Sequence, residues 1–394
     1  MLKIRYQNAL SLLKLATPLI VNNLAIAGIQ FTDAVMSGRL GSKELAAVAV
    51  GGSIWFLIFQ FYNGLLMAIS PIVARLYGAK QAALVGRYTR QACCMSLVVG
   101  VFVVFIMHNY VISIMDMIGI DIEFRHLVVD YLKAIIFGAP GIYLFLVFRY
   151  TTEGIGYTRP VMYASLIALV LNVFLNYIFM FGNLGMPAMG VLGCGVASAI
   201  SMWLVFCFLS LYVYFDSRYK ELNIFNRMTA FRLSVMQEIL KLGLPISITV
   251  TAEAGLFSAV SIMIGTLGTN ITGAHQIALN VVTTMFMIPL GISAAITVKV
   301  GQSLGANDVR AARLFGSTGI LMCALFMFLS ACFLLMFRQY IVDLYTTDIL
   351  IKEMAMSLLL VAAVFQIVDG IQIGAAGALR GDKDTKIPMF VKII

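Results

Sequence analysis

Three carboxylates interrupt long apolar stretches of this sequence, at positions where a charge is unusual. Glu253 lies in "ITVTAEAGLFSAVSIMIGTLG" (248–268), Asp369 in "VFQIVDGIQIG" and Asp33 in "QFTDAVMSGRLG". A carboxylate at the centre of a membrane-spanning helix costs about 2.5–3.5 kcal/mol on insertion scales, so such residues are rare and usually functional. These acids are therefore the first candidates for a site that handles cations.

Glu253 and Asp369 have two interpretations. No basic residue lies in the middle of either apolar stretch, so an ion pair within one helix explains neither acid. They could be separately buried, protonated carboxyl groups, or they could face one cavity and hold a proton, a Na⁺ ion or an organic cation in turn. Competition for one set of negative charges is a sufficient basis for exchange. We predict the shared site, and Na⁺ over H⁺ because paired carboxylates suit a hard cation.

Asp33 has possible polar partners in another stretch. Asn172 and Asn176, in "LNVFLNYIF", are four residues apart and share one face of a helix. They could join Asp33 in a polar cluster that binds a cation or a substrate. The alternatives are a helix-end acid that is paired with Arg39 or capped by Thr32, and an ordinary hydrogen-bonded asparagine pair, which in membranes contributes only about 0.6 kcal/mol.

Weaker signals come from single polar residues on apolar helices. Gln276 and Asn280 share a helix face, and Gln366 lies one turn before Asp369. All three could line a substrate cavity, and packing explains them equally well. Arg149 and Glu153, spaced four apart, are most simply an ion pair.

The elements that must position these residues are membrane helices. Hydrophobic residues make up 61% of the 394 residues, charged residues only 11%, and the mean hydropathy is +0.97. A soluble domain carries about 25% charged residues, so the composition predicts an all-α polytopic membrane protein. Ten windows are long enough to span a bilayer: 12–37, 45–74, 91–114, 127–152, 160–182, 188–215, 240–266, 272–298, 315–337 and 354–379. The second and eighth contain Gly, Asn or Pro and are candidates for a bend.

Basic residues are distributed unequally between the two sides of these spans. The N-terminus and the even-numbered connections hold 20 of the 27 Lys and Arg residues, and the odd-numbered connections hold 6. The positive-inside rule then places the N-terminus in the cytoplasm. The net charge of +9 is therefore an orientation signal and an attraction to anionic membrane lipid, not a nucleic-acid patch.

The chain repeats itself at an offset of 227 residues. "LKLATP" (13–18) aligns on "LKLGLP" (240–245), and "VARLYGA" (73–79) aligns on "VGQSLGA" (300–306). The first copy holds six spans, so both copies enter the membrane from the same side, as in a parallel repeat. Transporters built this way bind substrate between the repeats and alternate access by rocking.

The repeat predicts three segments. Residues 1–214 form an N-terminal six-helix lobe, 215–236 a cytoplasmic linker, and 237–394 a C-terminal lobe with four helices and the start of a fifth. A complete second copy needs about 60 more residues, so we expect a truncated second lobe.

The sequence excludes several energy sources and reactions. It contains no G-x-x-x-x-G-K-[ST] phosphate-binding loop, so an ion gradient rather than ATP should supply energy. It shows no nucleophile–base set or metal-ligand cluster, so we predict that the protein is not an enzyme and carries no cofactor.

The chain resembles the multidrug and toxic compound extrusion (MATE) family, NorM-like branch. The resemblance rests on "TDAVMSGRLG", "SPIVARLYGA", "KVGQSLGA", "TAEAGLFS", "AHQIALN", "VDGIQ" and "ALRGDKDTKIP". It implies twelve helices in two facing six-helix lobes and Na⁺- or H⁺-driven export of cationic amphiphilic drugs. It also implies a second-lobe cation site at Glu253 and Asp369 and a first-lobe site at Asp33, Asn172 and Asn176. The missing twelfth helix is the departure from the family.

We therefore predict a monomeric, cation-coupled antiporter of the bacterial inner membrane that exports organic cations by alternating access. One alternative is an inactive or partner-dependent fragment of such a transporter. Another is an exporter of a different substrate class, such as a lipid-linked carrier.

Overall fold

The computed structural model describes residues 2–118, 122–225, 232–265 and 267–393, and every regular element among them is helical. Within these described residues, ten helical segments are long and apolar enough to cross a membrane, which confirms the predicted number of spans. The elements are α1 (Leu2–Leu40), α2 (Ser42–Leu66), α3 (Ile69–Gly78), α4 (Ala82–Ile118), α5 (Ile122–Ile135), η1 (Ile136–Gly138), α6 (Ala139–Gly154), α7 (Arg159–Phe179), α8 (Gly190–Phe215), η2 (Ser217–Leu222), α9 (Leu233–Gly265), α10 (Thr269–Gly305), α11 (Val309–Asp343), α12 (Ile349–Gly381) and α13 (Lys386–Ile393).

Two spans are interrupted just before a proline. Pro71 has no N–H for the carbonyl of Met67, and the second span divides there into α2 and α3. Pro140 acts in the same way on Ile136, where the fourth span narrows into the short 3₁₀ turn η1 between α5 and α6. The eighth window, in contrast, forms one continuous helix, α10, although Pro289 lies inside it.

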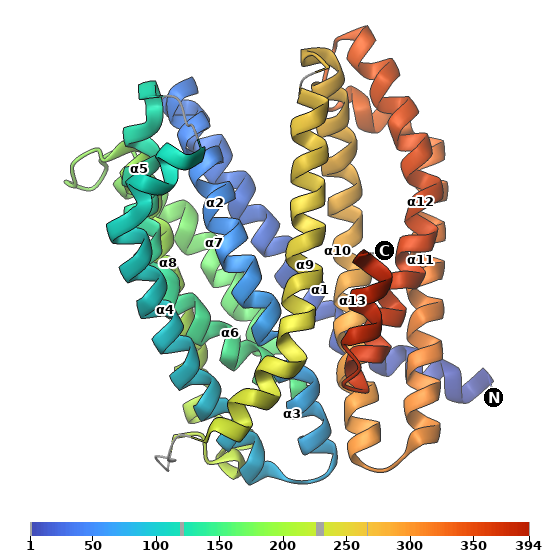
Figure 1. The fold of residues 1–394 in the computed structure, drawn as a ribbon. Coiled ribbons are helices and arrows are strands. Elements are labelled where there is room, and N and C mark those ends of the chain that lie inside the picture. Colours follow the sequence, from blue (N-terminus) through green and yellow to red (C-terminus); the bar gives the residue numbers. More distant parts are fainter. Residues whose placement is uncertain (1, 119–121, 226–231, 266, 394) are drawn as a thin grey trace.

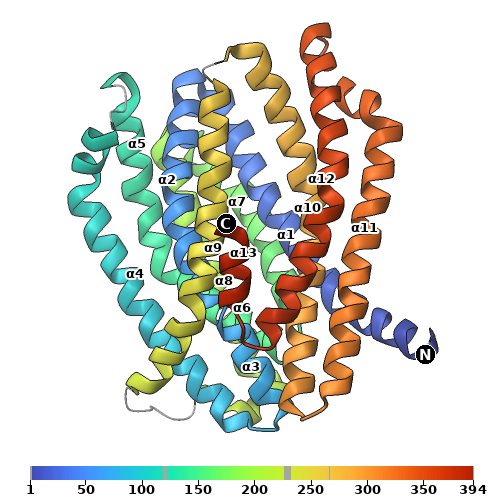
Figure 2. The same cartoon turned by 45° about the vertical axis from the view of Figure 1, so that its right-hand side comes forward.

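The helices form two bundles, with α1–α8 in one and α9–α13 in the other (Figures 1 and 2). We call these the first and second lobes. The first contains a large cluster of buried apolar side chains, including Tyr143 and Leu132. The second contains two smaller clusters, one of which includes Leu12 and Leu15 from the start of α1. Residues 226–231 of the predicted linker lie outside the described residues.

The lobes touch near the ends of the helices that adjoin η2, which we call the linker side. Glycines make this approach close. A Cβ atom added at Gly78 would lie 2.0 Å from the carbonyl oxygen of Gln302, and one added at Gly305 would lie 2.0 Å from that of Arg75. Gly78 and Gly305 are 227 positions apart, as are Arg75 and Gln302. The repeat therefore builds one contact twice, around a pseudo-twofold axis.

A second pair of glycines repeats the pattern one layer deeper in the membrane. A Cβ atom at Gly64 in α2 would lie 2.7 Å from the Cα atom of Ser247 in α9, and one at Gly291 in α10 would lie 2.6 Å from the Ile20 side chain in α1. These positions also correspond at the offset of 227. Each copy of the repeat thus presses its second span against the first span of the other copy.

Hydrogen bonds join the lobes at the same level. Gln302 Nε2 donates to the carbonyl oxygen of Gly154 at 3.0 Å, and Ser247 Oγ donates to that of Phe61 at 2.5 Å. On the other side of the membrane, the same helices present exposed apolar residues, with Phe31 71% and Leu256 66% exposed. The lobes therefore meet at the linker side and diverge toward the opposite side, as the V shape in Figure 1 shows.

Candidate functional site

The predicted cluster of Asp33 with two asparagines is present in the first lobe. Asn176 Nδ2 donates to Asp33 Oδ1 at 2.6 Å and also lies 3.3 Å from Asn172 Oδ1. Thr32 does not cap this carboxylate, because its hydroxyl donates to the backbone carbonyl of Gly28 at 2.8 Å. The structure thus brings together acid and amide groups from α1 and α7.

Two further residues, which the sequence did not indicate, lie beside this cluster. The Cys194 thiol from α8 and the Tyr131 phenol from α5 both lie within electrostatic range of the Asp33 carboxylate. The signal in the sequence is the pair of glycines that flanks Cys194. A Cβ atom at Gly195 would lie 2.7 Å from the Tyr131 carbonyl oxygen, so α8 can approach α5 only without side chains there.

The first-lobe cluster has unused hydrogen-bonding capacity. Among the described residues, Asn172 Nδ2 and Asn176 Oδ1 are buried and have no hydrogen-bond partner. Buried polar atoms are nearly always paired, by protein or by water. One free donor and one free acceptor beside a carboxylate can accommodate a water molecule, a hydrated ion or a polar substrate group.

The second lobe holds Glu253 on α9 and Asp369 on α12, two helices that both flank α10 (Figures 1 and 2). Both acids are half-buried. Hydrogen bonds fix α12 against α10: Ser293 Oγ donates to the Ile373 carbonyl at 2.7 Å, and Thr297 Oγ1 donates to the Gly377 carbonyl at 2.8 Å. The helix that carries Asp369 is therefore held in a defined register.

Glycines bring α12 equally close to α11. A Cβ atom at Gly370, the residue after Asp369, would lie 2.6 Å from the Met327 side chain, and one at Gly374 would lie 3.1 Å from the Ile320 Cα atom. This packing explains the place of Gln366. It is only 1% exposed, and its Oε1 accepts a hydrogen bond from Ser330 Oγ at 2.9 Å. In this conformation Gln366 lies inside the second lobe rather than on a cavity surface.

A basic residue approaches Glu253 from a distant part of the chain. Arg380, in the last turn of α12, is only 8% exposed, and it interacts electrostatically with the Glu253 carboxylate and with Tyr150 of the first lobe. Glu253 therefore has a positive charge nearby, although α9 carries no basic residue near its middle. The guanidinium group of Arg380 therefore contributes a positive potential at the Glu253 carboxylate.

The remaining candidates separate into two groups. Gln276 and Asn280 are exposed on α10, where a cavity between the lobes could reach them. Arg149 and Glu153 form the predicted ion pair, with Nε 2.8 Å from Oε1 and the carboxylate almost fully buried. We therefore assign this pair to the structure of α6.

The described residues contain no group of three or more His, Cys, Asp or Glu side chains that could hold a metal ion. A Na⁺ ion at Glu253 and Asp369 would need additional oxygen ligands from carbonyl groups, hydroxyls or water.

Comparison with known proteins connects this architecture to a family. Residues 18–178 and 245–394 match the MatE family model, which places one match in each lobe. The multidrug resistance protein NorM of Aliivibrio fischeri is 35% identical over 383 residues, covering 96% of this chain and 83% of the relative. The multidrug resistance protein MdtK of Photorhabdus laumondii is 35% identical over 388 residues, covering 98% and 85%.

Solved structures agree in fold. The outward-facing conformation of a multidrug resistance MATE family transporter of the MOP superfamily has a TM-score of 0.89 at 22% identity, covering 98% of this chain and 85% of that one. The eukaryotic MATE transporter AtDTX14 has a TM-score of 0.86 at 20% identity, covering 98% and 86%. The chain therefore belongs to the MATE family, and it is a multi-pass membrane transporter rather than an enzyme.

Proposed function

We propose that this protein is a cation-coupled antiporter that exports cationic amphiphilic drugs and toxic compounds. The observation that carries the proposal is the half-buried placement of acids in both lobes, on helices whose far halves diverge from one another. The relatives NorM and MdtK are named as multidrug resistance proteins, which supports drugs as the substrates. Acidic groups favour organic cations over the pyrophosphate of a lipid-linked carrier, which would call for basic residues.

Exchange follows from competition for the second-lobe acids. We infer that Glu253 and Asp369 form a cation site and that cation entry releases the drug. A ligand shifts a two-state equilibrium only through its different affinity for the two states. If the coupling cation binds more tightly to the state open on one side, and the drug binds more tightly to the state open on the other side, then each ligand shifts the equilibrium toward the state that it prefers. Na⁺ is our preferred coupling ion, and a matched pair of Na⁺ and pH gradients distinguishes it from H⁺.

The alternative function, an inactive or partner-dependent fragment, has its own test. The chain covers 83–85% of the length of the NorM and MdtK relatives. Ethidium accumulation is compared in cells that express this chain and in cells that express a version extended at its C-terminus to about 454 residues. Equal reduction by both forms supports the transporter, and reduction by the extended form alone supports the fragment.

The orientation gives a direct labelling prediction. We propose that the linker side faces the cytoplasm, on the basis of the distribution of Lys and Arg. In a cysteine-free background, a membrane-impermeant thiol reagent added outside intact cells should modify Met186→Cys, in the α7–α8 connection, and not Glu221→Cys, at the linker side. Both positions are exposed. Labelling of Glu221→Cys alone would reverse the orientation and, with it, the direction of export.

A contact between the lobes at the linker side, made by Glu238 of α9 with Tyr88 of α4, predicts a conformational effect. Lys383 Nζ lies 2.7 Å from Glu238 Oε1, and the Tyr88 hydroxyl of the first lobe donates to the other carboxylate oxygen. Because Glu238 is partly exposed, the contact should contribute no more than about 1 kcal/mol. Glu238→Gln should therefore raise the population open at the linker side by up to about fivefold.

Spin labels at exposed Gln81 and Arg310 measure this change as a distance distribution between the lobes. Lys352→Gln is the matched control, because Lys352 pairs with Asp343 on the opposite side at 2.5 Å. Identical distributions in Glu238→Gln and the control would show that the contact between Tyr88 and Glu238 does not hold the lobes together.

A further inference from the structure

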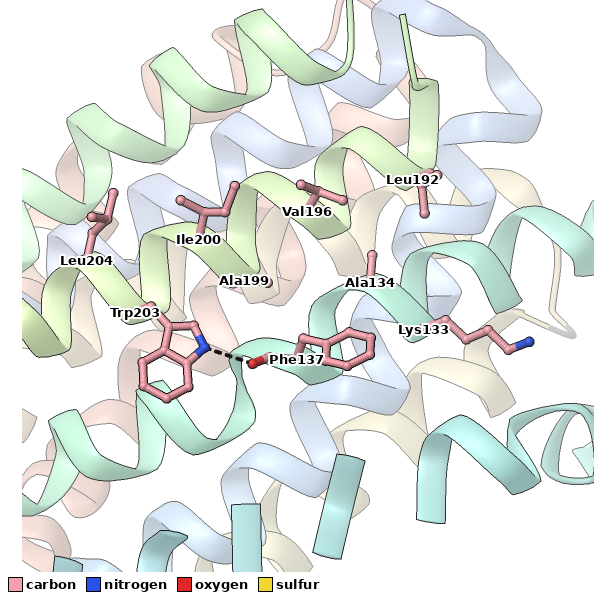
Figure 3. A pocket seen from close by; sticks show the side chains of 9 residues that line it. All are labelled: Lys133, Ala134, Phe137, Leu192, Val196, Ala199, Ile200, Trp203 and Leu204. Atoms are coloured by element: carbon pink, nitrogen blue, oxygen red, sulfur yellow. Dashed lines mark hydrogen bonds between the residues drawn. The ribbon is translucent and has the colours of Figure 1, made fainter. Parts of the chain in front are cut away.

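A groove on the outer surface of the first lobe, between α5 and α8, is separate from the transport residues (Figure 3). Its volume is 570 Å³, and its walls include Phe137 of η1 and Val196, Ile200, Trp203 and Leu204 of α8. The exposed fractions of Phe137 and Leu204 are 53% and 41%. Because α8 spans the membrane, this groove opens toward lipid rather than toward water.

The groove exists because the 3₁₀ turn η1 sits tightly on α8. A Cβ atom at Gly138 would lie 2.9 Å from the Ala199 Cα atom, so the two backbones are in contact. Trp203 Nε1 donates to the Phe137 carbonyl oxygen at 2.9 Å, which satisfies the indole N–H and one carbonyl of the turn. The walls are otherwise apolar along most of their length. Such a surface offers hydrogen-bond partners to neither water nor a polar ligand, so its occupant must be a hydrocarbon.

The length and direction of the groove match one leaflet. From Leu192 to Leu204 the α8 axis rises about 18 Å, close to the ~15 Å of hydrocarbon in half a bilayer. Leu192 and Lys133 lie together at one end, whereas Leu204 and Trp203 lie at the other (Figure 3). Leu192 is two residues from the start of α8 at Gly190, so the Lys133 end is at the membrane surface.

Lys133 gives the groove a charge preference. Its side chain extends past the apolar walls at the surface end (Figure 3). Within the described part of the chain it forms no ion pair, although exposed Asp130 lies one turn earlier on α5. The other basic residue of α5, Arg125, is already neutralised by Asp116 at 2.6 Å. An ammonium group at headgroup depth, next to an acyl-sized slot, complements a lipid phosphate.

We propose that this groove binds one acyl chain of an anionic phospholipid whose headgroup phosphate pairs with Lys133. The proposal depends on the surface of the first lobe alone, and it holds whether or not the chain exports drugs.

The test uses the full chain in vesicles of phosphatidylethanolamine and phosphatidylglycerol at three to one, with no ion gradient. A phosphatidylglycerol probe that carries a photoactivatable group in its acyl chain should label residues 134–137 and 192–204 preferentially. Lys133→Ala should lower this labelling about fivefold, as expected for one basic residue at the membrane surface, and Lys133→Arg should retain it. Val196→Phe should fill the groove and remove the labelling there.

Matched controls separate the groove from general lipid contact. Lys352→Ala removes a lysine that Asp343 already neutralises, and Val170→Phe enlarges a side chain on the exposed surface of α7. Both should leave groove labelling unchanged. Labelling spread evenly over the exposed faces of α7 and α8, or undiminished in both Lys133→Ala and Val196→Phe, would overturn the proposal. Equal labelling by a phosphatidylethanolamine probe would overturn the preference for an anionic headgroup.

Discussion

Replacing Glu253 with glutamine is expected to abolish gradient-driven drug export while the protein stays folded and inserted. The substitution keeps the size of the side chain and most of its hydrogen bonding, but it removes the charge for which we propose that cation and drug compete. An antiporter that switches fully between its two states uses a difference in affinity of about 10⁴-fold. Loss of the cation site should therefore reduce coupled efflux by about 100-fold or more, to the leak of protein-free vesicles.

The measurement is ethidium efflux from proteoliposomes under an imposed Na⁺ or H⁺ gradient, normalised to inserted protein. Glu353→Gln is the matched control, because Glu353 is an exposed acid near the start of α12 and should not contribute. Asp369→Asn should match Glu253→Gln, and the double variant should be no worse than either, since residues that act as a unit are not additive. Full coupled efflux from Glu253→Gln would return this acid to a structural role beside Arg380.

Asp33→Asn should reduce efflux less than either second-lobe substitution if the first lobe only assists. Its carboxylate accepts a hydrogen bond from Asn176, and the side-chain oxygen of an asparagine at this position can keep that bond.

The second large effect is expected from alanine at Gly78 and Gly305. The added Cβ atom would lie 2.0 Å from a backbone oxygen of the other lobe in each case, so the lobes must separate for it to fit. Overpacking of a close contact costs about 1–3 kcal/mol. Each substitution should therefore destabilise the state closed at the linker side by about 5- to 150-fold relative to the open state. Because both glycines lie at the same contact between the lobes, the double variant should destabilise the closed state by less than the sum of the two single substitutions.

The Gln81–Arg310 spin-label distance should lengthen in these variants, and ethidium efflux should fall about tenfold or more. Gly316→Ala is the control, because the added Cβ atom would lie 3.6 Å from the Ala378 Cβ atom, an ordinary contact inside the second lobe. Unchanged distances and efflux in Gly78→Ala and Gly305→Ala would mean that this closed packing is not a working state of the transport cycle.

Hydropathy and the repeat predicted much of this architecture. The ten spans follow from the length of the apolar runs, because a bilayer accepts only helices of about that length. The offset of 227 that links "VARLYGA" to "VGQSLGA" also pairs Gly78 with Gly305 at the crossing of the lobes. A repeated glycine in a repeated span indicates a shared close contact, although the sequence does not say with which element.

Contacts between helices of the same lobe were harder to predict. The spacing of Asn172 and Asn176 was sufficient to place them on one face, and that face turned out to lie toward Asp33. Cys194 and Tyr131 were missed because their approach depends on how α5 and α8 are rotated, which no period in the sequence records. Gln366 was expected to be a candidate cavity residue, but close packing through Gly370 and Gly374 places it between α11 and α12.

Arg380 shows the same limit for electrostatics. It is 127 positions from Glu253 and lies in a different helix, so neither periodicity nor local charge pattern connects the two. The cation site that we propose at Glu253 and Asp369 therefore has a fixed positive charge within electrostatic range of Glu253.

The most direct test of cation-coupled exchange is reciprocal flux through the purified, reconstituted chain. Vesicles loaded with ²²Na⁺ are diluted into Na⁺-free buffer with and without ethidium at constant pH, and the movements of Na⁺ and ethidium are followed together. Coupling free energies are mutual, so an ethidium gradient should drive Na⁺ in the opposite direction, just as a Na⁺ gradient drives ethidium. We predict countermovement of the two cations that is lost in Glu253→Gln. An ethidium flux that does not change with either the Na⁺ gradient or an imposed pH gradient would contradict cation-coupled exchange.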